Sequence, residues 1–506
     1  MNVRPNKVVR LNGVVFFPTI FFFLSVVLYS LQDNAGFLDL VKSANDWILD
    51  HFGWLFTWSS FCLLAILLVV YFSPLARKKI GGPEAQPILN KWKWFAITLC
   101  TTIAAGLIFW GTAEPLYHLH QPPAGLSMAA NSANARDFAM STLFMHWSFT
   151  PYGIYTITGL VFALAYYNFK QPFSIGSLFF PFFNAQGRKG LFLLDIICLT
   201  ALVAGMAASL GTGIFALVGG METIFGLEKT SFLLGLIGFL IVLTFLLSTA
   251  SGLQKGITWL STWNTVGFFI LAALILLMGP TLSILKIGGE GLLDYAGHFL
   301  SRSTNLGASI EESWLKNWTV FYFANWFAWA PVSALFLGRL SVGYTVRDFI
   351  NFNLIFPSLF TCCWMVIFGG SSLALDQDSQ GMLFEILSAE GEENVLYQMF
   401  DFFPGSRSLS ITALVLIFFS YVTIADSNVS AMSAISTTGI QPKHPEAPIW
   451  IRVVWGSLIG LIAWVMISEA GIDGIRMLCV LGGFPALFII SMVGLGMIKL
   501  LISRDY

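Results

Sequence analysis

The chain has few charged residues. Only 10% of its 506 residues are Asp, Glu, Lys or Arg, whereas about a quarter of the residues are charged in soluble domains. This scarcity excludes an ordinary soluble protein. The net charge is −1 and no segment gathers basic residues, so nothing in the sequence indicates a nucleic-acid partner.

Cysteine and histidine are sparse as well. The six cysteines lie within or at the ends of apolar runs and lack metal-ligand spacing, which argues against a disulfide framework or a metal site. The six histidines are scattered, and no His-Glu-x-x-His motif occurs. An intramembrane enzyme would need clustered ligands or a nucleophile–base pair. We therefore expect neither an enzyme nor a bound cofactor.

Long apolar runs fill the chain instead. Hydrophobic residues make up 56% of it, and runs of about twenty residues can each cross a bilayer core of about 30 Å. The runs predict an all-α polytopic membrane protein. We expect twelve transmembrane helices, near residues 13–33, 52–74, 93–118, 138–168, 190–220, 231–250, 256–280, 315–342, 346–374, 406–436, 449–468 and 472–502.

Basic residues divide unequally between the loops of this topology. With the N-terminus in the cytoplasm, 18 of the 26 Lys and Arg residues fall on the inner side. Loops rich in Lys and Arg stay in the cytoplasm. We expect a multi-pass protein of the plasma (inner) membrane with both termini cytoplasmic.

Two outer segments are longer than simple turns. Ser283–Arg302 mixes leucines with charged residues, which is typical of a helix lying along a membrane surface. Asp376–Pro404 is acidic and is predicted to be a solvated extracellular loop. His118 and His120 are expected at the outer mouth, in contact with water.

Aromatic residues are concentrated in two of the apolar runs. Asn317–Pro331 reads NWTVFYFANWFAWAP, with seven aromatic residues in fifteen, and His146–Tyr155 reads HWSFTPYGIY. Two such clusters facing each other would form a dry aromatic box. Because ring faces carry negative electrostatic potential, a box of this kind suits a quaternary ammonium ion. The alternative is that these rings only pack the core.

Five motifs in order carry a resemblance to the betaine/choline/carnitine transporter family. They are Trp110–Pro115 (WGTAEP), His146–Tyr155, Ser251–Gly256 (SGLQKG), Trp318–Arg347 and Thr423–Asn428 (TIADSN). The resemblance implies leucine-transporter-type inverted five-helix repeats at 93–282 and 312–502, preceded by two extra helices within 1–92. It also implies a substrate site near the bilayer midplane and a homotrimer. The segment 283–311 carries a surface amphipathic helix, whose residues 283–302 are expected to form an interface of the trimer.

The resemblance assigns the box residue by residue. The family's aromatic positions in the fourth span fall on Trp147, Tyr152 and Tyr155. In the eighth span, Trp326 and Trp329 match box tryptophans, and Phe323 and Asn325 stand where Trp is usual. Tyr117 matches a tyrosine that completes the box in carnitine-type members.

The third span bears on the substrate. Thr101–Gly106 reads TTIAAG and keeps only the last glycine of the family's Gly-x-Gly-x-Gly break. Choline-carrying members tend to have an Asp at the position of Gly106. Because an uncompensated cation in a low-dielectric pocket is costly, we expect a zwitterion such as glycine betaine or a carnitine-type compound. A symporter of choline or another compatible solute is the alternative, and a channel is a further one.

Ion coupling is left open by the resemblance. Sodium-coupled members read Thr-Ser-Ala-Asp-Ser where this chain has Thr423, Ile424, Ala425, Asp426 and Ser427. Ile424 removes one oxygen from the hard-cation ligand set, which favours sodium-independent exchange. Exchangers, however, carry an Arg where this chain has Asn264. Sodium coupling through other oxygens, such as Ser209 or Ser333, and proton coupling through Glu114 or Asp426 remain alternatives.

Overall fold

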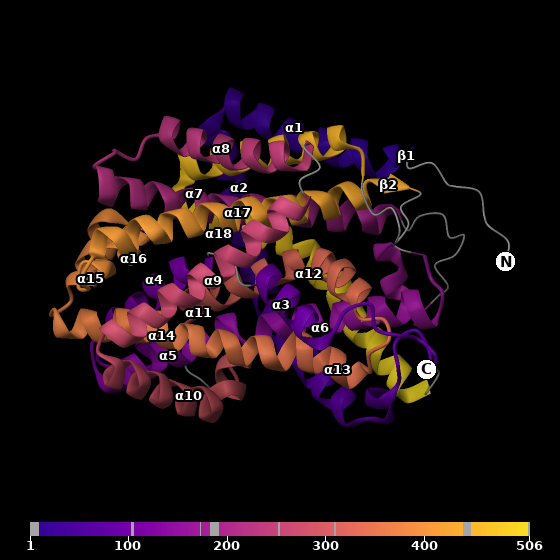
Figure 1. Cartoon of the computed structure of the whole chain (residues 1–506), viewed down its shortest axis with the longest axis horizontal. Helices are drawn as coiled ribbons and strands as arrows, with labels where there is room; N and C mark the ends of the chain where they lie inside the picture. Colours follow the sequence, from indigo (N-terminus) through magenta and orange to yellow (C-terminus); the bar gives the residue numbers. More distant parts are fainter. Residues whose placement is uncertain are drawn as a thin grey trace.

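The computed structural model describes residues 10–503 except 103–105, 173, 183–191, 251–253, 308–309 and 439–446. Its described part is almost entirely helical (Figure 1). Helices are favoured because backbone N–H and C=O groups in apolar surroundings must pair within the chain, and a helix pairs them locally. The predicted all-α class is confirmed.

The described residues up to Met278 form nine α-helices. The elements in order are β1 (Arg10–Leu11), α1 (Gly13–Gln32), α2 (Asn34–Phe72), η1 (Pro74–Arg77), α3 (Lys91–Thr102), α4 (Gly106–His120), η2 (Ala124–Leu126), α5 (Ala133–Trp147), α6 (Phe149–Ala163), η3 (Leu164–Asn168), η4 (Ile175–Phe179), α7 (Phe192–Phe225), α8 (Ser231–Ala250) and α9 (Gln254–Met278).

The described residues from Thr281 onward form nine further α-helices, two η helices and one short strand. They are α10 (Thr281–Thr304), α11 (Glu312–Leu315), η5 (Lys316–Val320), α12 (Phe321–Leu340), α13 (Val346–Ile350), η6 (Asn351–Ile355), α14 (Phe356–Asp378), α15 (Met382–Glu390), α16 (Glu392–Phe400), α17 (Ser406–Ile435), β2 (Thr437–Thr438) and α18 (Ile449–Ser503). The two short strands, β1 and β2, pair antiparallel.

Nine helices of the described residues are long and apolar enough to cross a membrane, or ten if one bent pair counts as a span. The predicted number of twelve is therefore not confirmed by this count. One difference arises at α18, whose 55 residues include the non-helical Gly471, where the sequence predicted two spans. Another lies at the predicted third span, where α3 and α4 flank residues outside the described part.

The surface segment is a helix, as predicted. α10 makes an angle of 106° with the last part of α9, and Gly279 and Pro280 separate them. Several of its leucines are exposed, including Leu282 and Leu293. A sharp turn followed by a half-apolar helix is the form expected of a segment that leaves a span and follows a surface.

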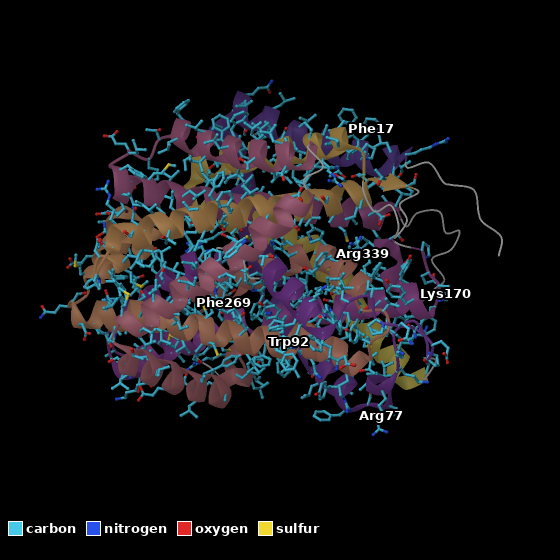
Figure 2. The ribbon with its side chains drawn as sticks, viewed as in Figure 1. Phe17, Arg77, Trp92, Lys170, Phe269 and Arg339 are labelled. Atoms are coloured by element: carbon cyan, nitrogen blue, oxygen red, sulfur yellow. The ribbon has the colours of Figure 1, made fainter. Side chains whose placement is uncertain are left out.

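The molecule has two distinct ends. β1 and β2 lie at one end, and α15 and α16 at the other (Figure 1). Figure 2 shows Arg77, Lys170 and Arg339 toward the end that carries β1. Large apolar side chains, among them Phe17 and Phe269, are exposed on the outside, as expected of a surface that faces lipid.

Candidate aromatic substrate site

Two tryptophans from different helices form the centre of the aromatic site. Trp147 is the last residue of α5, and the non-helical Ser148 separates it from α6. Trp326 lies on α12. Their ring centroids are 5.1 Å apart and the ring planes make an angle of 74°. Tyr155 of α6 is nearly perpendicular to Trp326, at 6.2 Å.

Each of the two indoles is held by its N–H group. Nε1 of Trp326 donates to the backbone oxygen of His146 at 2.8 Å. Nε1 of Trp147 donates to Oε2 of Glu114, also at 2.8 Å. Because both donors are used, the two ring faces have fixed directions, as a preformed cation site requires.

Gly106 lies close to the Trp147 ring. A methyl group added to it would be 3.8 Å from the hydroxyl of Tyr421 and 3.9 Å from Cη2 of Trp147. Tyr421, on α17, is buried and was not selected from the sequence. It stands two residues before Thr423, so its position next to a motif was the available signal.

The other residues assigned to the box have contacts of their own. Tyr152 shares a hydrogen bond of 3.1 Å with the Thr361 hydroxyl on α14. Phe323 is fully buried, with its ring 6.3 Å from that of His146.

Two further assigned residues face neighbouring helices. The indole of Trp329 lies against Gly205 of α7. Asn325 accepts a hydrogen bond from the Cys479 thiol of α18 at 3.4 Å. Ring contacts therefore join Trp147, Trp326 and Tyr155 directly. Tyr152, Trp329 and Asn325 each contact a neighbouring helix as well.

Tyr117 is connected to the site through a series of rings. Its hydroxyl donates to Glu392 of α16 at 2.8 Å, and its ring is 5.1 Å from Trp318. The ring of Trp110 lies 6.3 Å from that of Trp318 and 5.9 Å from that of Tyr322. Tyr322 lies 5.2 Å from Trp147, so an unbroken aromatic path leads from α16 to the centre of the site.

The residues considered for ion coupling lie on four helices. Thr423, Asp426 and Ser427 are on α17, Ser209 on α7, Ser333 on α12 and Asn264 on α9. The Thr423 hydroxyl donates to the Phe419 carbonyl at 2.9 Å, and Ser427 is exposed. Residues 103–105, the other half of the expected sodium site, lie outside the described residues. Ion coupling stays a prediction.

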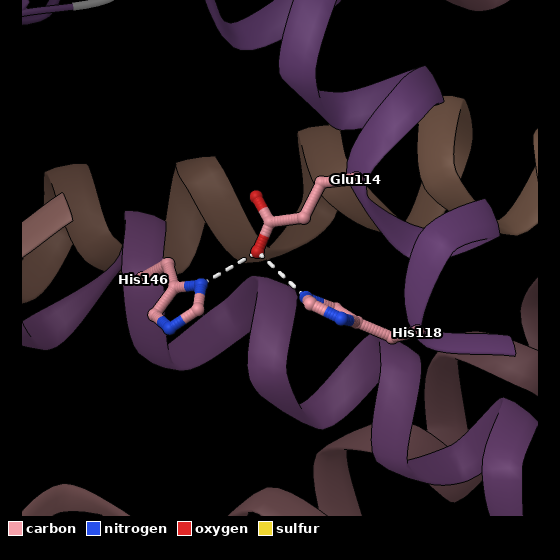
Figure 3. A group of neighbouring side chains, drawn as sticks. All are labelled: Glu114, His118 and His146. Atoms are coloured by element: carbon pink, nitrogen blue, oxygen red, sulfur yellow. Dashed lines mark hydrogen bonds and ion pairs between the residues drawn. The ribbon is translucent and has the colours of Figure 1, made fainter. Parts of the chain in front are cut away.

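A buried ionisable cluster adjoins the tryptophans. Glu114, His118 and His146 converge from α4 and α5 (Figure 3). Oε1 of Glu114 is 2.6 Å from Nδ1 of His146 and 3.4 Å from Nε2 of His118. All three side chains are fully buried.

The prediction that His118 is in contact with water was wrong. Its ring is enclosed by Trp318 at 4.7 Å and Trp314 at 5.0 Å. The spacing of four from Glu114 placed both residues on one helix face, and this was the usable signal. The covering rings come from η5 and α11, which local sequence does not reveal.

The cluster offers two ring nitrogens and one carboxylate oxygen within 4.8 Å of one another, a ligand set that zinc accepts. However, the 2.6 Å between Glu114 and His146 is a hydrogen-bond distance. Hydrogen bonds from the two histidines to the Glu114 carboxylate therefore join the cluster.

The acidic outer segment is also less solvated than predicted. Asp376, Glu392 and Glu393 are all buried. Asp376 pairs with His120 at 2.6 Å, and Glu393 pairs with Lys229. The segment forms α15 and α16 instead of a loop, because its apolar residues Leu383, Leu387 and others pack inward.

Comparisons with known proteins agree with this architecture. A model described as BCCT, betaine/carnitine/choline family transporter, matches residues 14–505. Glycine betaine transporter 1 of Vibrio parahaemolyticus is 32% identical, over 85% of this chain and 82% of its own. An ectoine/hydroxyectoine transporter of Virgibacillus pantothenticus is 28% identical, over 94% and 93%.

A third relative is a high-affinity choline transport protein of Escherichia coli. It is 28% identical, over 98% of this chain and 73% of its own. The family match covers nearly the whole described fold, including the helices that carry both tryptophans. The chain therefore belongs to the betaine/carnitine/choline family of transporters, polytopic helical membrane proteins that are not enzymes.

Proposed function

We propose that this protein carries trimethylammonium zwitterions, such as glycine betaine or carnitine-type compounds, across the membrane by alternating access. The observation that supports this most is the perpendicular pair of Trp147 and Trp326, with Tyr155 beside it. A trimethylammonium group has no N–H donor, so ring faces are its natural partners. Each cation–π contact contributes about 0.5–2 kcal/mol, so several together give micromolar to millimolar affinity.

A zwitterion is favoured over choline by the residue at the wall of the site. Gly106 supplies no negative charge next to Trp147. The nearby Glu114 directs its oxygens at His146, His118 and the Trp147 N–H, away from the ring faces. A substrate carrying its own carboxylate compensates its cation. Relatives named for glycine betaine and for ectoine are consistent with this choice.

We further propose that transport is exchange without sodium. Ile424 is buried and aliphatic at the position where sodium-coupled members have a hydroxyl, and Ser427 points to the exposed side of α17. The cytoplasmic location of both termini and the homotrimer remain parts of this proposal. The basic residues near β1 support the first of them (Figure 2).

The test is uptake of radiolabelled glycine betaine into proteoliposomes. We expect preloading with unlabelled substrate to accelerate uptake, because the binding site of an exchanger returns to the outer side only with substrate bound. We expect an imposed sodium gradient to have no effect on uptake. Steep sodium dependence without an effect of preloading would contradict exchange. Uptake that does not saturate would instead indicate a channel, and selective uptake of choline would contradict the zwitterion.

A further inference from the structure

The Glu114–His118–His146 cluster is connected to both tryptophans of the aromatic site. The Glu114 carboxylate binds the Trp147 N–H through Oε2 and His146 through Oε1. The backbone oxygen of His146 in turn accepts from Trp326. A change of charge or geometry in the cluster therefore acts directly on the two rings that would hold the substrate.

The hydrogen bonds of His146 are compatible with two protonation states. Its Nδ1 faces the Glu114 carboxylate, so Nδ1 carries a proton in either state. Its Nε2 lies 3.1 Å from the Thr319 hydroxyl, which can donate to a neutral ring or accept from a protonated one. Neither state leaves His146 or Thr319 without a partner. The cluster carries about −1 when both rings are neutral and no net charge after binding one proton.

His118 adds a second nitrogen that can take up or release a proton. Its Nδ1 is buried and has no hydrogen-bond partner among the residues that the structure describes. Such a nitrogen is rare in the interior of a protein, where nearly all polar atoms are paired. Its presence beside a buried carboxylate suits a site whose proton content changes.

Charged groups on the surrounding helices are already engaged elsewhere. Five such groups on the described residues of these helices have partners of their own: Arg476 of α18, Glu392 and Glu393 of α16, Asp376 of α14 and Arg302 of α10. Their partners are, in the same order, Asp473, Tyr117, Lys229, His120 and Asp294. The rings of Trp318 and Phe138 stand between the two arginines and His118.

We propose that the Glu114–His118–His146 cluster is a proton-binding site linked to the aromatic site, so that a proton and a quaternary ammonium oppose each other's binding. This inference rests on the proposed function. The negative cluster polarises the Trp147 indole through its N–H and attracts a cation at the ring face. A proton bound to the cluster cancels that charge, and substrate binding returns the proton to solvent.

The test is calorimetric titration of the purified protein with choline and with glycine betaine between pH 5.5 and 8.5. Repeating it in buffers of different ionisation enthalpy counts the protons released. We expect affinity to rise roughly fivefold to thirtyfold with pH, with up to one proton released. The effect should be larger for choline, which has no carboxylate of its own.

Glu114→Gln is the decisive variant, because the amide oxygen can still accept from Trp147 while the charge is removed. We expect it to flatten the pH profile and abolish proton release. His298→Gln is the matched control, since His298 is exposed on α10, and its profile should equal that of the unaltered protein. If Glu114→Gln does not fold, the proton count of the unaltered protein still decides.

Three results would overturn the proposal. They are an affinity independent of pH with no proton exchanged, a pH dependence that persists in Glu114→Gln, and loss of binding in EDTA, which would mark the cluster as a metal site. Absence of binding at every pH would instead refute the proposed function, and this proposal with it.

Discussion

At the scale of single residues, Trp326 lies at the centre of the proposed site. Its ring lies beside both Trp147 and Tyr155. Replacing it by Leu removes one cation–π contact of up to about 2 kcal/mol and should raise the Kd for glycine betaine roughly 10- to 30-fold. Fluorescence titration of the purified variant measures this.

Trp92→Leu is the matched control for that substitution. Trp92 is also a tryptophan of a helix, α3, but it is 81% exposed (Figure 2). We expect the Kd of Trp92→Leu for glycine betaine to equal that of the unaltered protein. The Kd of Trp326→Phe, which keeps a ring, should lie between the values for the unaltered protein and for Trp326→Leu. Normal uptake by Trp326→Leu would remove Trp326 from the site.

Gly106→Asp should change the preferred substrate. Its Cβ would make ordinary contacts of 3.8 and 3.9 Å with Tyr421 and Trp147, so the backbone need not move. The new carboxylate would compensate a cation that has no carboxylate and would repel one that does. In competition binding, the affinity for choline relative to that for glycine betaine should rise by about tenfold or more. An unchanged ratio would show that Gly106 does not face the substrate.

The sequence predicted the two tryptophans because each lies in an unusual aromatic cluster. It did not predict that His118 and Asp376 are buried. The hydropathy of a segment averages over all faces of the helix. The burial of one side chain, by contrast, depends on residues from distant segments that pack against it. For His118 those rings are Trp314 and Trp318, nearly two hundred residues away.

At the scale of the element, α18 depends on the conformation of Gly471. This residue has φ 57° and ψ −137°, a backbone conformation that is essentially confined to glycine. Gly471→Ala should therefore destabilise the protein by about 1 kcal/mol or more, seen as a lower temperature of thermal unfolding in detergent.

Gly289→Ala provides the comparison. Neither glycine has an atom within 4 Å of an added methyl group, so only the backbone conformation differs. Gly289 lies within α10, where alanine is favoured by about 1 kcal/mol. Equal unfolding temperatures for the two variants would show that the Gly471 conformation carries no strain.

Glu311 fastens the turn at η2 to the start of α11. The backbone N–H groups of Gly125 and Ala124 donate to its carboxylate at 3.0 and 2.8 Å and hold the pKa of Glu311 below its usual value. The stabilisation is therefore complete above the ordinary carboxyl pKa of about 4.3 and is lost as the pH falls through the lowered value.

Hydrogen exchange at these two amides measures the effect. We expect Glu311→Gln to expose them at pH 6, as acid does in the unaltered protein. Glu312→Gln, at a neighbouring exposed residue that pairs with Lys316, should leave their protection unchanged. Equal protection in both variants would contradict the role of the carboxylate.

The boundaries of elements were predictable where hydropathy changes sharply. α8 spans 231–250, as expected, and α17 ends one residue early. By contrast, α2 begins at Asn34, 18 residues before its predicted start at 52. Its first half is too polar for a hydropathy threshold, yet it contains no proline to end a helix.

At the scale of the whole molecule, the proposed site lies where α4, α5, α6, α12 and α17 meet. The mobility that alternating access requires must change the contacts between these helices. Trp147 and Trp326 belong to different helices, and both are hydrogen-bonded to residues of the Glu114–His118–His146 cluster. A movement of these helices would therefore change both the substrate contacts and the hydrogen bonds of the cluster.

In the proposed site, the faces of aromatic rings hold the positive charge of the substrate. The most direct measurement compares the affinity of the purified protein for glycine betaine with that for 3,3-dimethylbutanoate, which has the same shape but carbon in place of the charged nitrogen. We expect the neutral head group to bind at least about tenfold more weakly, because it loses the cation–π contacts. Equal affinities would contradict it, since the aromatic site would then be selecting shape alone.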